Sequence, residues 1–117
     1  MTLDELAVRL REFAAAREWE QFHAPKNLAM ALAGEVGELL AELQWLTPEE
    51  AARVMEDPDA ATRMRSELAD VTIYLVRLAD LLGVDLIEAA RAKLTESERR
   101  YDVENYRGSA RKAPPIS

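Results

Sequence analysis

Two short acidic segments carry the residues of this sequence that could do chemistry. Glu35 and Glu38 stand three positions apart inside one apolar stretch. Glu67 and Asp70 repeat that spacing inside another. On a helix, side chains three residues apart share a face, so each pair would hold two carboxylates side by side. Like charges on neighbouring turns repel and acids among apolar residues are costly to desolvate, so the pattern predicts a divalent cation that neutralises both pairs.

The ligand types indicate which cation this would be. Four carboxylates supply only hard oxygen ligands, which suits Mg²⁺, with Mn²⁺ as the alternative. A di-iron centre is disfavoured because it needs a Glu-x-x-His step on two helices, and the single histidine, His23, lies outside both segments. Magnesium held by a few carboxylates keeps water positions that phosphate oxygens can fill. The chemistry we expect is therefore phosphoryl transfer to a water molecule.

An ordinary solvated helix face is the alternative interpretation of both acidic pairs. Glu67 and Asp70 could then form ion pairs with nearby arginines, which are Arg63, Arg65 and Arg77. Position favours the metal site, because aliphatic residues surround both pairs and neither segment contains a lysine or an arginine.

Helical periodicity accounts for the elements that must position these acids. Apolar residues recur at helical spacing over four stretches, and no strand-like alternation occurs. We expect an all-α fold with main helices at 3–17, 25–45, 60–82 and 85–100 and a short connecting helix at 47–56. Capping boxes at Thr2 and Thr47, a cap at Asp85 and a C-terminal Gly83 set several of these limits.

Two glycines lie inside the second expected helix. Gly34 and Gly37 flank Glu35, and each weakens a helix by about 1 kcal/mol relative to alanine. They indicate either close packing of another helix or the approach of a ligand to the backbone.

Composition restricts the class of protein. The 117 residues suit one small domain, which often completes its core by oligomerising. A net charge of −7 argues against binding a nucleic-acid polymer. No run approaches the roughly 20 apolar residues of a membrane span. Without cysteines, and with an acidic rather than basic N-terminus, the expected location is the cytoplasm.

Aromatic residues are concentrated before and after the second helix. Trp19, Phe22 and His23 precede it, and Trp45 closes it. Tyr74 follows Asp70 by one helical turn, on the same face. Each of these could instead belong to the core. Indole and phenol rings offer flat faces to a nucleotide base and polar edges to its substituents, so the set favours a base-binding site.

These residues together resemble a known family, the MazG-like all-α nucleotide pyrophosphohydrolases, and most closely its dCTP pyrophosphatase branch. The similarity extends from about residue 3 to residue 112. The segments that carry it are Arg17–His23, Pro25–Leu28, Glu35–Leu39, Gln44–Trp45 and Glu67–Leu75.

The resemblance implies a helical bundle and Mg²⁺-dependent hydrolysis of a nucleoside triphosphate to its monophosphate and pyrophosphate. By position, it implies that the metal ligands are Glu35, Glu38, Glu67 and Asp70. It implies a base and sugar pocket formed by Trp19, Gln21, Phe22, His23, Trp45 and Tyr74. Lys26 and Arg100 would contact phosphate, and Glu38 would act as general base. It also implies a homodimer or homotetramer. The domain is expected at 1–107, and the C-terminal segment 108–117, which contains Pro114 and Pro115, is expected to be a mobile tail.

The sequence departs from that family at three places. Leu10 stands where relatives in the dCTP branch can place a histidine, which leaves the base preference open. Asp102 stands where a proline is expected, and a terminal Lys-Tyr is absent after Lys112. The alternatives are the same chemistry on dUTP or another non-standard nucleotide, or a helical adaptor without catalytic activity.

Overall fold

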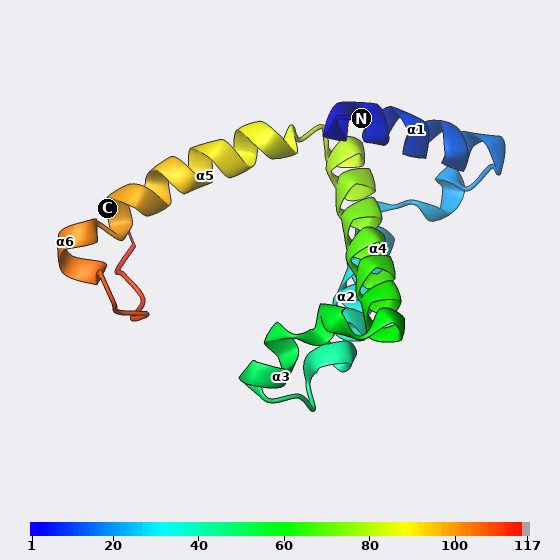
Figure 1. Ribbon diagram of the computed structural model, residues 1–117. Coiled ribbons are helices and arrows are strands. Elements are labelled where there is room, and N and C mark those ends of the chain that lie inside the picture. The colour runs from blue at the N-terminus through cyan, green and yellow to red at the C-terminus, as the bar shows by residue number, and fades with distance from the viewer. Residues whose placement is uncertain (116–117) are drawn as a thin grey trace. The chain divides into compact units, whose positions relative to one another are not determined.

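The computed structural model describes residues 1–115, and all regular structure within them is helical (Figure 1). This confirms the predicted all-α class. None of the helices in this range combines the length and apolar character needed to cross a membrane. The helices are α1 (Leu3–Ala16), α2 (Pro25–Leu43), α3 (Pro48–Ala52), α4 (Pro58–Leu82), α5 (Leu86–Arg100) and α6 (Val103–Tyr106), with short 3₁₀ helices η1 (Glu20–Phe22) and η2 (Val54–Glu56).

Most helix ends lie where local sequence predicts them. At α3, the Thr47 hydroxyl accepts a hydrogen bond from the Glu50 amide, and the Glu50 carboxylate accepts one from the Thr47 amide. Thr2 and Asp85 cap α1 and α5 through single side-chain bonds. Gly83 ends α4 with a φ of 69°, a left-handed conformation that glycine adopts without steric cost.

Some elements differ from the sequence-based expectation. The single connecting helix expected at 47–56 is divided into α3 and the 3₁₀ helix η2. Helix α4 begins at Pro58, two residues earlier than predicted, because the Asp57 carboxylate accepts a hydrogen bond from the Ala60 amide at 3.1 Å. Proline suits the first turn of a helix, where its missing N–H has no partner to lose. The short helix α6 was not predicted, and Asp102 caps it by accepting from the Asn105 amide.

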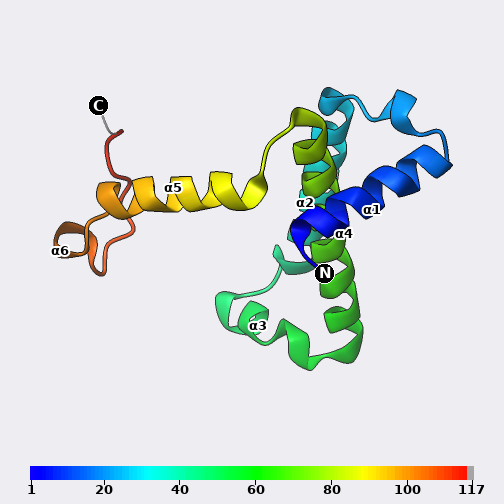
Figure 2. The ribbon, with the colours of Figure 1, turned by 90° about the horizontal axis from the view of Figure 1, so that it is seen from above.

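The chain divides after Gly83 into two compact units. In the first unit, α2 and α4 lie side by side and antiparallel, and they make the largest contact between any two helices (Figures 1 and 2). Helix α1 packs against α4. Both acidic pairs therefore lie on the two helices that form the centre of this unit.

The core of the first unit is thin. Its buried apolar residues are Ala14, Leu28, Ala60, Ala61, Met64, Val76 and Ala79. No large side chain among residues 1–115 is fully buried, whereas Leu40 of α2 is 58% exposed and Leu75 and Leu82 of α4 are also exposed. The first unit by itself thus leaves much of its central helix pair uncovered.

The second unit holds α5, α6 and the segment after them. Within it, the Arg100 guanidinium donates hydrogen bonds to the carbonyl oxygens of Ala113 and Pro114. Ala113 is buried, and its amide donates to the Tyr101 hydroxyl at 3.2 Å. The predicted mobile tail at 108–117 remains a prediction, and its last two positions lie outside the described residues.

Candidate metal and nucleotide site

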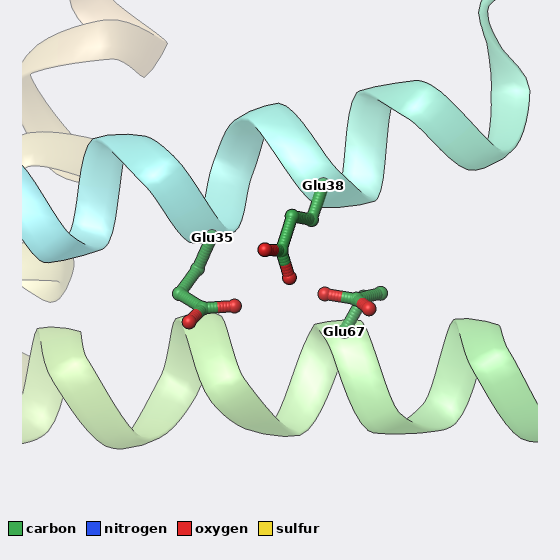
Figure 3. A group of neighbouring side chains, drawn as sticks. All are labelled: Glu35, Glu38 and Glu67. Carbon is green, nitrogen blue, oxygen red and sulfur yellow. The ribbon is translucent and has the colours of Figure 1, made fainter.

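Three glutamates of the first unit point toward one another between α2 and α4 (Figure 3). Glu35, Glu38 and Glu67 each place a carboxylate oxygen within 4.8 Å of the others. The three-residue spacing on α2 puts Glu35 and Glu38 on one face, and the antiparallel packing turns that face toward α4. Asp70, one turn after Glu67, lies just beyond this group of three. We call these four residues the acid cluster.

Electrostatics in the acid cluster disfavours four negative charges. Partial burial raises the pKa of Glu35, and the charges of Glu38 and Asp70 raise it further. Partial burial likewise raises the pKa of Glu67, reinforced by Glu38 and then by Glu35 and Asp70. Glu35 and Glu67 are therefore harder to ionise than isolated glutamates.

Two oxygens of the acid cluster lack compensation within the described part of the chain. The Oε2 atoms of Glu35 and Glu67 are buried and have no hydrogen-bond partner there. Buried polar atoms are normally paired, because an unpaired one loses its water without gaining a new contact. A divalent cation fits this site, since it would supply the missing partner and accept hard oxygen donors from both helices.

Two of the three arginines that could have made the cluster an ordinary salt-bridged surface pair with other acids. Arg63 donates to Glu42 at 3.0 Å, and Arg77 donates to Asp80 at 3.2 Å. Neither bond involves an acid of the cluster.

A pocket opens beside Asp70 in the same unit. Its volume of about 170 Å³ is smaller than that of sites that enclose a whole drug-sized ligand. It could take a single heterocyclic base, with any attached phosphates outside. The lining residues are Leu10, Phe13, Trp19, His23, Leu28, Asp70, Ile73, Tyr74 and Arg77. We call this space the aromatic pocket.

The aromatic pocket brings together three of the predicted base-binding residues, Trp19, His23 and Tyr74. It also has Leu10 in its wall, the position where the sequence departs from the family pattern. Asp70 belongs to both the pocket and the acid cluster, so the two features adjoin at that residue.

The other predicted substrate residues do not line this pocket. The Gln21 side chain donates to the Glu18 carbonyl at 3.0 Å. Phe22 is 60% exposed and Trp45 is 86% exposed. Lys26 is exposed at the start of α2. Substrate binding by these four residues remains a prediction.

Backbone geometry after α1 places the pocket aromatics. Glu18 has a φ of 54°, a left-handed conformation that is strained for a residue with a side chain. This reverses the chain so that the Trp19 amide donates to the Ala14 carbonyl at 2.9 Å. The Trp19 ring then packs edge-on against Phe13 and His23, at centroid distances of 5.6 and 6.4 Å.

Sequence reasoning missed Arg77 as a pocket residue. Its side chain is buried, with 5% exposed, and its Nε donates to Nδ1 of His23 at 3.1 Å. Burial lowers the pKa of His23, and the charge of Arg77 lowers it further. A signal was available, because Arg77 follows Tyr74 by three positions and Asp70 by seven, which places all three on one face of α4.

Comparison with known proteins gives consistent results. The MazG-like family matches residues 31–113, which include both acidic pairs. The chain is 46% identical over 109 residues to dCTP pyrophosphatase 1 of Bos taurus, covering 93% of this chain and 64% of that protein. It is 45% identical over 111 residues to dCTP pyrophosphatase 1 of Homo sapiens, covering 95% of this chain and 65% of that protein. The chain thus spans somewhat less than two thirds of these relatives.

A solved structure is also similar along most of its length. It is the crystal structure of a pyrophosphatase from Archaeoglobus fulgidus DSM 4304, which aligns with a TM-score of 0.78 and 40% identity. The alignment covers 85% of this chain and 91% of the archaeal one. This chain belongs to the MazG-like family.

Proposed function

We propose that this protein is an Mg²⁺-dependent nucleoside triphosphate pyrophosphohydrolase that converts dCTP or a modified dCTP to the monophosphate and pyrophosphate. The observation that carries the proposal is the pair of buried, unpartnered oxygens on Glu35 and Glu67, which lie beside an aromatic pocket of base size. Similarity to two dCTP pyrophosphatases and to an archaeal pyrophosphatase supports it.

Glu35, Glu38, Glu67 and Asp70 would hold Mg²⁺, with Mn²⁺ as the alternative. When bound, the cation polarises a phosphoryl oxygen and makes a water molecule more acidic. Its positive charge would favour the ionised form of Glu35 and Glu67, whose pKa values burial and neighbouring acids raise.

The aromatic pocket would bind the base. Trp19 and Tyr74 offer ring surfaces for stacking, and His23 offers a polar edge. Because Asp70 joins the pocket to the acid cluster, a base held there directs its phosphates toward the cluster. Lys26 and Arg100 remain candidates for phosphate contacts.

Glu38 would serve as general base. It is the exposed member of the three glutamates that meet between the helices, so a water molecule can reach its carboxylate. It would accept the proton of the water that attacks the phosphorus atom next to the sugar. The bond to the pyrophosphate leaving group then breaks.

The substrate preference has a second candidate with a specific basis. Leu10 contributes an apolar side chain to the aromatic pocket where the dCTP branch can place a hydrogen-bonding histidine. Another deoxynucleotide, such as dUTP, is therefore the alternative substrate for the same chemistry.

A panel of nucleoside triphosphates assayed with Mg²⁺ tests the proposal. We expect pyrophosphate release, with the highest kcat/KM for a cytosine deoxynucleotide, and loss of activity in Glu38→Gln and Asp70→Asn. Glu12→Gln, an exposed change on α1, is the matched control and should retain full activity. Full activity in folded Glu38→Gln and Asp70→Asn would contradict the assigned metal site. No turnover of any nucleotide would favour the adaptor alternative.

A further inference from the structure

A chain of hydrogen bonds runs from the surface of α1 to the aromatic pocket. Arg11 donates two bonds to Asp80, from Nε at 3.1 Å and from a terminal nitrogen at 2.7 Å. Asp80 also accepts from Arg77 at 3.2 Å. Arg77 in turn donates from Nε to Nδ1 of His23 at 3.1 Å. The last member, His23, lines the pocket.

In the bond between Arg77 and His23, the chemistry of the donor determines the protonation state of the histidine ring. A guanidinium carries N–H donors and no acceptor, and it stays protonated in proteins. Nδ1 of His23 must therefore present its lone pair to Arg77. A neutral imidazole carries one N–H, so the proton lies on Nε2. An imidazolium is incompatible with this bond because both of its nitrogens are donors.

Asp80 and Arg11 keep the Arg77 guanidinium in position to donate to His23. The guanidinium is buried, and its Nη1 donates to Asp80 while its Nε donates to His23. Arg11 also forms an ion pair with Asp80. The charged groups that act on His23 are Arg77, which opposes its protonation, and Glu20, which favours it.

We propose that Arg77 fixes His23 as the neutral tautomer protonated at Nε2, so that His23 offers the aromatic pocket a hydrogen-bond donor and no acceptor. Arg77 is then a positioning residue that acts through His23. The matching ligand is a base whose edge presents an acceptor there, a carbonyl oxygen or an unprotonated ring nitrogen, as cytosine does. A base that presents an N–H at that place is rejected. This consequence for the ligand rests on the proposed function, whereas the tautomer does not.

Nuclear magnetic resonance on the nucleotide-free protein tests the tautomer directly. The chain has one histidine, so its ring signals need no assignment by mutagenesis. A long-range ¹H–¹⁵N spectrum at neutral pH should show Nε2 protonated and Nδ1 bare. Protonation at Nδ1, protonation at both nitrogens, or an averaged mixture would each overturn the proposal. This measurement needs no variant and no enzymatic activity.

Replacement of Arg77 tests whether this residue fixes the tautomer of His23. In Arg77→Met, Asp80 keeps its two bonds from Arg11, so no carboxylate is left alone. We expect a mixture of both neutral tautomers and a higher His23 pKa. Arg63→Met, on the same helix and paired with Glu42, removes an equivalent charge away from the pocket and should leave the His23 spectrum unchanged. A wild-type tautomer population in Arg77→Met would overturn the role of Arg77.

Kinetics test the consequence for recognition. Loss of one ordered hydrogen bond should raise KM for the best nucleotide roughly three- to tenfold in Arg77→Met, with a smaller change in kcat. Arg77→Lys, which retains a charged donor, should recover part of this loss. A fall in kcat at unchanged KM would contradict a role in base recognition. If no nucleotide is turned over while the spectrum matches, the proposed function fails and the tautomer stands.

Discussion

At the level of single residues, the acid cluster contains carboxylate oxygens without a partner in the described part of the chain. Glu35 and Glu67 each have one buried oxygen without a partner, and each has a raised pKa because of burial and neighbouring acids. In the metal-free protein the folded state is therefore opposed by the same carboxylates that we expect to bind the cation.

Mg²⁺ should reverse the order of thermal stability of the wild type and Glu67→Gln. Without a divalent ion the variant should melt a few degrees above the wild type, because one of the repelling charges is gone. With Mg²⁺ the order should invert, since the wild type gains binding energy that the variant lacks. Thermal unfolding in EDTA and in excess Mg²⁺ measures the difference in melting temperature between the two proteins under each condition. Glu12→Gln serves as control, and an equal Mg²⁺ response in wild type and Glu67→Gln would contradict the assignment.

Asp80→Asn should lower stability in a pH-dependent way. Hydrogen bonds from Arg11 hold the pKa of Asp80 below its ordinary value of 3.8. Its stabilising contribution is therefore complete above about pH 4 and is lost as pH falls through the lower folded value. We expect a loss of about 2 kcal/mol at pH 7, from hydrogen bonds to a charged group.

Urea unfolding of Asp80→Asn and wild type at a series of pH values checks this expectation. The difference in free energy of unfolding should shrink as the pH falls below 3.8. If the difference in free energy of unfolding stayed constant down to pH 2.5, the charge of the Asp80 carboxylate would not be the source of its stabilising effect.

The acids of the cluster could be predicted from the sequence because their i, i+3 repeat needs only helical geometry. Asp70 and Tyr74 followed from the same rule. The partnership of Arg77 with His23 could not, since the two residues are 54 positions apart and meet only through the packing of the loop on α4. Trp45 shows the opposite case, an aromatic residue with a plausible position whose ring is largely exposed in the single chain.

At the level of elements, the two glycines of α2 have open space around them. Among the described residues of the first unit, a Cβ added at Gly34 or Gly37 would meet nothing within 4 Å. The other helices of this unit therefore do not explain the two glycines. Close packing of a helix from a second copy and approach of a ligand to the backbone both remain predictions.

Gly34→Ala and Gly37→Ala should each stabilise the protein by about 1 kcal/mol, because alanine restricts the unfolded chain and favours a helix. Chemical denaturation measures this directly. If a ligand approaches the backbone beside Glu38, Gly37→Ala should also raise KM while Gly34→Ala does not. A loss of stability in either variant would mean that another surface, such as a second copy of the chain, packs against α2.

Helix limits could be predicted where a cap decides them and less well where several signals compete. Thr47 and Asp85 begin helices through side-chain caps, and Gly83 ends one because it adopts a positive φ. Helix α4 begins two residues before the expected residue 60, because Asp57 is its N-cap and Pro58 its first residue.

For the whole molecule, the thin core of the first unit predicts that copies of this chain associate with one another. Exposed leucines on α2 and α4 leave apolar surface in water that a second copy could cover. We expect sedimentation velocity to show a dimer or tetramer at micromolar concentration, with a melting temperature that rises with concentration. Leu40→Lys should shift the protein toward monomer, and Ala15→Lys, which adds the same charge on α1, should not. A wild-type monomer across this range would contradict the expectation.

The fold class could be predicted from the sequence because every long segment repeats with helical period. The division after Gly83 could not, because it depends on which helices find partners within the chain. The small size of the domain already predicts association, but the surface that a second copy would cover can be identified only in the folded chain.

In the proposed reaction, the acid cluster directs water to the phosphorus atom next to the sugar. Hydrolysis of dCTP in ¹⁸O-labelled water with Mg²⁺, followed by ³¹P NMR, tests this most directly. We expect labelled dCMP and unlabelled pyrophosphate, and no reaction in EDTA. Release of orthophosphate with dCDP, or label in the pyrophosphate, would contradict it.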